Sequence, residues 1–223
     1  MEFLTIPASA PYTSPVEKQT SPQAKRRWKS FMTNNRALSV AVLGKDGVGK
    51  SAFTVRALTR RFIGEYDPFL ELNYKHSMEI DGQYLALDVL DTAGKNSEEK
   101  LERASENTEI YFLLYSTTDK RSFTEAEEIA EYLFETKNID PSTLTIVATK
   151  KDLVHMREVD EYEGRFLAQN YGCAFAQISI SEHYTETVST VQNAIKECIN
   201  RLNIRKKANG FLDTLRRRSW SGQ

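Results

Sequence analysis

The sequence predicts an α/β fold in which a mostly parallel β-sheet is flanked by helices. Short apolar runs alternate with longer segments whose apolar residues recur at helical spacing, and this alternation is typical of parallel strands joined by helices. The pair Asp81-Gly82 separates two of the runs and indicates one antiparallel hairpin. A glycine-rich loop, Gly44–Ser51, lies between the first apolar run and the first helical segment, which is the arrangement found in P-loop proteins.

The expected elements follow from these patterns. Strands are expected at the apolar runs, residues 37–43, 74–80, 84–90, 110–115, 144–148 and 174–178. Helices are expected where apolar residues return every three or four positions, at residues 50–62, 122–136, 158–171 and 187–202. We therefore divide the chain into a flexible N-terminal extension (residues 1–35), a nucleotide-binding domain (residues 36–202) and a basic C-terminal tail (residues 203–223).

The composition predicts a folded protein of the cell interior. The 223 residues suffice for one domain with extensions, and 30 Lys and Arg against 31 Asp and Glu give a net charge of −1, so no charge excess points to nucleic acid. The two cysteines, Cys173 and Cys198, form no C-x-x-C pair and fit a reducing compartment. The chain shows neither the roughly 18-residue apolar stretch of a membrane helix nor a secretory signal. We expect a cytoplasmic monomer.

The loop Gly44–Ser51 has the chemistry of a phosphate cradle. Its glycines allow the backbone to turn successive N–H groups inward, and the helix that follows adds the positive end of its dipole. Lys50 supplies a charge for the outer phosphates, and Ser51 supplies a hydroxyl ligand for Mg²⁺. Because strand, loop and helix occur in the required order, the sequence predicts a nucleotide site rather than a chance glycine-rich turn.

Two later motifs also follow strands. Asp91-Thr92-Ala93-Gly94 offers a carboxylate that can hold Mg²⁺, usually through water, and Gly94 leaves room for a terminal phosphate. In Thr149-Lys150-Lys151-Asp152, the carboxylate of Asp152 can accept the N1 and N2 protons of guanine, which adenine does not offer, and the stem of Lys150 can cover the purine face. Each motif alone is weak, but their common position at strand ends indicates a guanine-nucleotide site.

The segment from Ala37 to Leu202 resembles the Ras-like small GTPases, and most of all the Ras-related oestrogen-regulated growth inhibitor group. The resemblance implies a G domain that binds GTP or GDP with Mg²⁺, held by Ser51 and Asp91, and that acts as a signalling switch with effector and exchange-factor proteins. Phe62 would pack edgewise on the base, Tyr66 would cover the phosphates, and the backbone of Ser179-Ile180-Ser181, in place of Ser-Ala-Lys, would contact the guanine carbonyl. The nucleotide-binding residues that it implies are Gly44, Lys45, Asp46, Gly47, Val48, Gly49, Lys50, Ser51, Ala52, Phe62, Tyr66, Gly94, Thr149, Lys150, Asp152, Leu153, Ser179 and Ile180.

Three positions depart from the family pattern where hydrolysis would occur. Phe69 replaces the threonine that ligates Mg²⁺ and orders the first switch. Lys95 replaces the glutamine that orients the attacking water, which leaves Lys50 and Lys95 as the candidate catalytic residues. Asp46 replaces a glycine of Ras and crowds the space for an arginine finger, whereas Thr149 for asparagine is a milder change.

These departures predict slow GTP hydrolysis. One alternative is a scaffold that binds nucleotide without switching, and another is neutral drift that other residues compensate. A P-loop kinase is disfavoured, because it leaves the motifs at 91–94 and 149–152 unexplained together.

The tail after Leu202 combines two basic clusters, Arg205-Lys206-Lys207 and Arg216-Arg217-Arg218, with apolar residues between and after them. It ends without a cysteine, so we expect no prenylation. Besides a solvated tail, three interpretations stay open: peripheral contact with an anionic membrane, binding to a calmodulin-like partner, and nuclear import.

Overall fold

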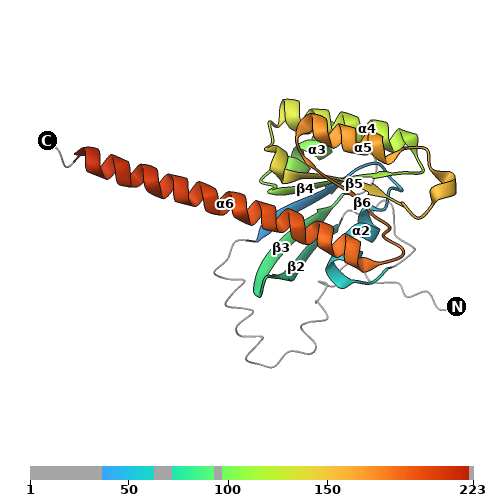
Figure 1. Cartoon of the computed structure of the whole chain (residues 1–223), viewed down its shortest axis with the longest axis horizontal. Helices are drawn as coiled ribbons and strands as arrows, with labels where there is room; N and C mark the ends of the chain where they lie inside the picture. Colours follow the sequence, from blue (N-terminus) through green and yellow to red (C-terminus); the bar gives the residue numbers. More distant parts are fainter. Residues whose placement is uncertain (1–36, 63–71, 93–96, 221–223) are drawn as a thin grey trace, which may run out of the picture.

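A six-stranded sheet forms the centre of the protein (Figure 1). The computed structural model describes residues 37–62, 72–92 and 97–220, with side chains as far as residue 202 except that of Gln83. The strands are β1 (Leu38–Leu43), β2 (Leu72–Ile80), β3 (Gln83–Asp91), β4 (Ile110–Ser116), β5 (Leu144–Thr149) and β6 (Ala174–Gln177). Their order is β2-β3-β1-β4-β5-β6, and only β2 and β3 pair antiparallel. The predicted fold class and the hairpin at Asp81-Gly82 are confirmed.

Helices cover both faces of this sheet. They are α2 (Lys50–Thr59), α3 (Glu98–Ser105), α4 (Lys120–Glu131), α5 (Glu161–Tyr171) and α6 (Tyr184–Trp220). A π-helical turn, η2 (Tyr132–Thr136), extends α4, and two 3-10 turns, η3 (Pro141–Thr143) and η4 (Val154–Met156), lie in connections. No helix in the described part of the chain is long and apolar enough to cross a membrane.

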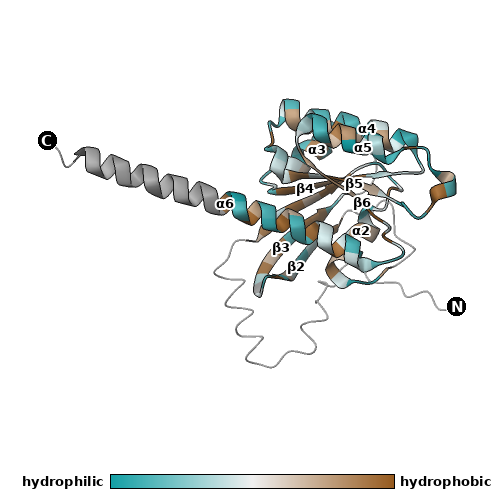
Figure 2. Ribbon diagram, in the orientation of Figure 1, coloured by the Kyte–Doolittle hydropathy of each residue, from teal (hydrophilic) through white to brown (hydrophobic). Residues whose placement is uncertain are grey.

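Two apolar cores form because side chains alternate along each strand. On β1, Val40 and Val42 face one core with residues of α2 and α6, such as Phe53 and Ile195. Ala41 and Leu43 face the other core, which α3, α4 and α5 close. In Figure 2 the central strand β4 is strongly apolar, whereas the helices carry many polar residues.

Several helix boundaries differ from the prediction, and one helix was not predicted. Helix α4 begins at Lys120 rather than residue 122, and helix α6 begins at Tyr184 rather than residue 187. Helix α2 ends at Thr59 rather than residue 62, because Arg60 takes a left-handed conformation with φ of 62°. Helix α3 was not predicted; the Ser97 side chain caps it by accepting from the Lys100 N–H. Helix α5 begins at Glu161 rather than residue 158, after a capping box at Asp160. Helix α6 continues to Trp220, well past the expected end at residue 202.

Candidate nucleotide-binding site

The three predicted motifs meet at one edge of the sheet. Asp91 at the end of β3 lies opposite Val42 in β1, two residues before Gly44. Thr149 at the end of β5 lies opposite Ser116 in β4, which is the other neighbour of β1. Parallel strands bring their carboxyl ends to the same edge, where α/β proteins bind ligands.

The phosphate loop is shaped by its glycines. Gly44 has a φ of 131°, and a Cβ there would lie 2.1 Å from the carbonyl oxygen of Leu114 in β4. Gly47 and Gly49 have φ of 78° and 98°, a region that favours glycine. The loop therefore packs directly on the backbone of β4 before it turns into the N-terminus of α2, where anions bind favourably.

Lys50 closes over this loop from the first turn of α2. Its side chain is only 6% exposed, and its Nζ donates to the carbonyls of Gly44 at 2.8 Å and Lys45 at 3.0 Å. Burial lowers the pKa of Lys50, whereas the nearby charges of Asp46, Asp91 and Glu125 oppose that shift. An ammonium held among carbonyls and carboxylates at this position is suited to meet phosphate oxygens.

The Asp46 carboxylate already forms an ion pair with the Lys50 ammonium. Its Oδ1 lies 3.5 Å from the Lys50 Nζ. A bound phosphate would lie near the same ammonium, so the two anions would share one cation.

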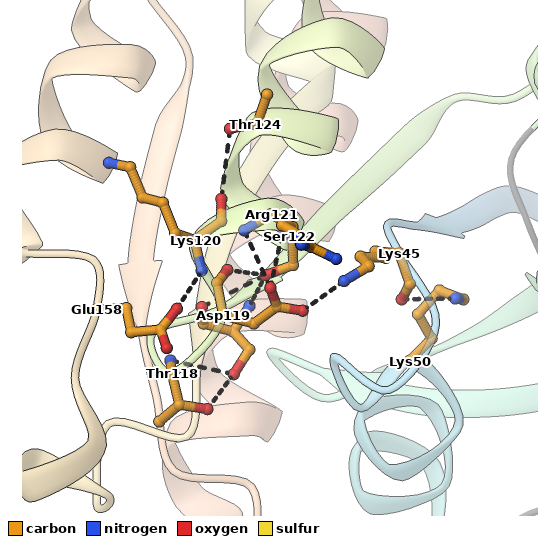
Figure 3. Close-up of polar contacts among 10 residues, drawn as sticks. Lys45, Lys50, Thr118, Asp119, Lys120, Arg121, Ser122, Thr124 and Glu158 are labelled. Atoms are coloured by element: carbon orange, nitrogen blue, oxygen red, sulfur yellow. Dashed lines mark hydrogen bonds and ion pairs between the residues drawn. The ribbon is translucent and has the colours of Figure 1, made fainter.

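Lys45 points away from Lys50 and ties the loop to α4 (Figure 3). Its Nζ lies 2.7 Å from Oδ2 of Asp119. The other carboxylate oxygen of Asp119 caps α4 by accepting from the N–H groups of Arg121 and Ser122. These contacts, that from Lys45 first, hold the pKa of the Asp119 carboxyl below its usual range against the opposing effect of burial. One carboxylate thus joins the phosphate loop to the start of α4.

Ser51 and Asp91 provide the donor set that Mg²⁺ prefers. Both are oxygen donors, and the Asp91 side chain is almost fully buried beside β1. The next residue, Thr92, fastens this strand end by donating its hydroxyl to the Val42 carbonyl at 2.8 Å. No group of three or more His, Cys, Asp or Glu residues that could hold a metal occurs among the described residues. One hydroxyl and one carboxylate fit Mg²⁺, because this ion keeps several waters and completes its shell with substrate phosphates.

Thr149 joins the base side of the site to the phosphate side. Its buried hydroxyl lies 2.8 Å from the carbonyl oxygen of Val48 in the phosphate loop and 3.0 Å from that of Tyr115 in β4. The Thr117 N–H donates to the Thr149 carbonyl at 3.1 Å. The threonine therefore holds three chain segments together at the point where the two motifs meet.

The next residues hold the loop that carries Asp152. Lys150 has a left-handed φ of 59°, and its carbonyl accepts from the Thr117 hydroxyl at 3.1 Å. Asp152 is partly exposed, and its Oδ2 accepts from the Ser181 hydroxyl at 3.3 Å. Leu153, which follows, is 39% exposed. The Asp152 carboxylate is thus oriented by the loop after β6 and open to a ligand.

The loop after β6 lies against both earlier loops. A Cβ on Gly49 would lie 3.3 Å from Cδ1 of Ile180, so this isoleucine packs on the phosphate loop. Ser179 is buried, and its N–H donates to Oε2 of Glu186 at 3.2 Å. Phe62 follows α2 and is 45% exposed, with the guanidinium carbon of Arg56 5.9 Å from its ring centroid.

The residues of this site lie within a region that matches a known protein family. The model of the Ras family matches residues 39–203, which span the sheet and all the loops described above. The chain belongs to the Ras family. The human Ras-related and estrogen-regulated growth inhibitor is 40% identical over 148 residues, 66% of this chain and 74% of that protein. Human Ras-like protein family member 11B is 34% identical over 169 residues, 73% of this chain and 68% of that protein. Mouse GTP-binding protein Rit1 is 34% identical over 154 residues, 67% of this chain and 69% of that protein.

Membership of the Ras family confirms the resemblance and gives the chain its class, a small GTPase with a G domain. Four of the residues considered for this Ras-family protein lie outside the described part of the chain: Tyr66, Phe69, Gly94 and Lys95. The structure brings together the remaining candidates from the phosphate loop, the end of β3 and the loops after β5 and β6. Their roles toward a nucleotide stay predictions.

Sequence reasoning missed three residues of the Ras-family site, namely Arg56, Asp119 and Glu186. Asp119 had a local signal, because an aspartate directly before a helical segment is a common cap. Arg56 and Glu186 had no local signal. The partner of Arg56, the Glu182 carbonyl, lies 126 positions away, and Lys151, a partner of Glu186, lies 35 positions away.

Proposed function

We propose that this Ras-family protein is a guanine-nucleotide switch that binds GDP and GTP with Mg²⁺ and hydrolyses GTP slowly. The observation that carries the proposal is the Thr149 hydroxyl, which lies within hydrogen-bond distance of the Val48 carbonyl. Through it the loop that carries Asp152 and the loop that carries Lys50 become one surface, so that one ligand can reach both.

Each part of a guanine nucleotide has a matching group in this arrangement. The Asp152 carboxylate would accept from the base, and Phe62 would lie against the base edge. Lys50 and the N–H groups of the phosphate loop would hold the phosphates. Ser51 and Asp91 would hold Mg²⁺, which supplies neutralising charge at the outer phosphates when bound.

The slow hydrolysis rests on the neighbourhood of Lys50. The Asp46 carboxylate lies 3.5 Å from its ammonium, so negative charge stands where transition-state charge would develop and where an arginine finger would approach. Phe69 and Lys95 remove, in addition, the hydroxyl ligand and the water-orienting amide of the family.

Nucleotide analysis of the purified protein tests the binding. We expect guanine nucleotide to copurify, and we expect Asp152→Asn to shift the preference from guanine toward xanthine, because an amide can donate where the carboxylate accepts. No binding of GDP or GTP with Mg²⁺ would overturn the proposal.

Single-turnover hydrolysis tests the chemistry. We expect slow turnover in the wild-type protein and a gain in both Lys95→Gln and Asp46→Gly, with the largest rate in the double variant. Turnover as fast as that of an active small GTPase, or no gain in any of the three variants, would contradict the assigned cause.

A second candidate function is a nucleotide-loaded scaffold for protein interaction that does not switch, and the contact of Asp46 with Lys50 favours it as well. Amide exchange separates the two. A switch should show different exchange at residues 64–74 and 95–108 with GDP and with a non-hydrolysable GTP analogue, whereas a scaffold should show none.

The remaining proposals concern partners. We infer a monomer whose effectors and exchange factors are proteins, and whose basic residues at 205–207 and 216–218 allow peripheral membrane contact. Sedimentation with anionic and neutral liposomes tests this contact, and equal binding by a chain that stops at residue 202 would remove it.

A further inference from the structure

Glu186, in the first turn of α6, holds Ser179 in the loop between β6 and α6. Its Oε2 accepts from the N–H of Ser179 at 3.2 Å, and its Oε1 forms an ion pair with the ammonium of Lys151. Glu186 therefore joins residues 179–182 of this loop, here called the purine loop, to the loop that carries Asp152.

The charge of Glu186 is maintained in this position. Burial opposes its ionisation, but the hydrogen bonds from Lys151 and from the Ser179 N–H outweigh burial, and the pKa of Glu186 lies below its usual range. An ionised acceptor makes a stronger bond to a backbone N–H than a neutral one.

The purine loop is held at its last residue by Arg56 from α2. Arg56 is a buried residue, and its Nη2 donates to the carbonyl of Glu182 at 3.0 Å. Its guanidinium carbon lies 5.9 Å from the ring centroid of Phe62. One side chain thus contacts both the purine loop and the aromatic residue that is expected to lie against the base.

A chain of hydrogen bonds connects Glu186 to the carboxylate of Asp152. The Ser179 N–H donates to Glu186, the Ser179 and Ser181 hydroxyl oxygens lie 3.1 Å apart, and the Ser181 hydroxyl donates to Oδ2 of Asp152 at 3.3 Å. Ser181 stands where the Ras family has a lysine, and in this protein its hydroxyl bonds to the Asp152 carboxylate.

We propose that Arg56 and Glu186 are positioning residues that fix the purine loop at both ends, so that Asp152 and the loop backbone are preorganised for guanine and nucleotide release is slow. The inference rests on the proposed binding of guanine nucleotides. Its physical basis is that a loop ordered before binding loses little conformational freedom when the ligand arrives.

The release of fluorescent GDP and of fluorescent inosine diphosphate from the Mg²⁺-loaded protein tests the proposal. Inosine lacks the exocyclic amine from which Asp152 would accept one hydrogen bond but keeps the N1–H, so it reports on that one base contact separately. The variants are Glu186→Ala, Glu186→Gln and Arg56→Met, and Arg165→Met serves as the matched control because it removes an exposed ion pair with Glu161 on α5.

We expect Glu186→Ala and Arg56→Met to speed GDP release about tenfold, the effect of losing one buried hydrogen bond to a charged group. Glu186→Ala should speed inosine diphosphate release less than GDP release, because part of its effect passes through Asp152. Glu186→Gln keeps an acceptor for the Ser179 N–H and should recover part of the wild-type rate, and Arg165→Met should release both nucleotides at that rate.

Two results separate the possible failures. If the wild-type protein binds no guanine nucleotide, the proposed function is wrong. If it binds, but Glu186→Ala and Arg56→Met lower the melting temperature without a change in GDP release, or speed both nucleotides equally, the two residues only support the fold and the positioning role is overturned.

Discussion

Replacing Thr149 by valine removes one hydroxyl from the junction of the two binding loops and keeps the shape of the side chain. That hydroxyl lies 2.8 Å from the Val48 carbonyl and 3.0 Å from the Tyr115 carbonyl, and Thr149 is fully buried. A hydroxyl has one proton, so at any moment it serves one of the two acceptors. In Thr149→Val neither carbonyl has this donor, and a methyl group lies against them instead.

The expected loss follows from the burial of these groups. A buried polar group that loses its partner destabilises a protein by about 1–3 kcal/mol. With a urea dependence of about 2 kcal/mol per M, the unfolding midpoint should fall by roughly 0.5–1.5 M. GDP release should become faster as well, because the base loop and the phosphate loop are no longer joined through Val48.

Urea unfolding followed by circular dichroism, in excess GDP and Mg²⁺, measures the first effect, and chase of a fluorescent GDP measures the second. Thr149→Ser is the control, since it keeps the hydroxyl and loses only a methyl group. If Thr149→Val unfolds at the same urea concentration as Thr149→Ser and releases GDP at the wild-type rate, the hydroxyl does not join the loops and the reasoning fails.

Three further predictions follow from single contacts. Gly44→Ala should abolish nucleotide binding or destabilise the fold by about 3 kcal/mol or more, because its Cβ would lie 2.1 Å from the Leu114 carbonyl oxygen. Gly47→Ala has no neighbour within 4 Å and should destabilise the fold by only about 1 kcal/mol. Equal thermal stabilities of the two variants would refute this. Tyr115→Phe should be neutral or stabilising, because the buried phenol oxygen has no hydrogen-bond partner among the described residues. It should also lessen the destabilisation by Gly164→Ala, whose Cβ would lie 2.1 Å from that oxygen. Additive changes in the free energy of unfolding in the double variant would contradict the contact. Lys45→Met should destabilise the protein by at most about 1 kcal/mol at neutral pH, and the difference from wild type should shrink as pH falls below about 4. The reason is the lowered pKa of Asp119: its ion pair with Lys45 stabilises the fold above the unfolded-state pKa, and this stabilisation is lost as pH falls through the folded-state pKa. A difference that persists unchanged at pH 3 would assign the effect to packing.

The sheet and the loop positions could be predicted from the sequence because their signals are local. Buried parallel strands are continuous apolar runs, and the segment Ile110–Ser116 is buried at every residue. The phosphate loop has a fixed spacing of glycines and a lysine. Such signals survive without any knowledge of the tertiary structure.

The helix ends and the second layer of the site could not be predicted in this way. Helix α3 buries only Lys100, Leu101 and Ala104 in a very polar segment, which leaves no clear apolar stripe to detect. Helix α2 stops at an arginine in the left-handed region, where sequence rules look for glycine. The bond from Arg56 to Glu182 spans 126 residues and exists only because α2 packs beside the start of α6.

The continuous helix α6 projects from this G domain as one extended element. The helix starts beside the loop after β6, and Figure 1 shows it running away from the sheet to the far end of the molecule. Its 37 residues correspond to roughly 55 Å at about 1.5 Å per residue, of which the part after residue 202 is about 27 Å. A flexible linker would let the domain rotate freely about an attachment point, whereas a continuous helix sets the distance and the direction between that point and the domain. A contact made at the outer end of α6 would therefore hold the G domain at a distance, with the loop after β6 at the opposite end of the helix.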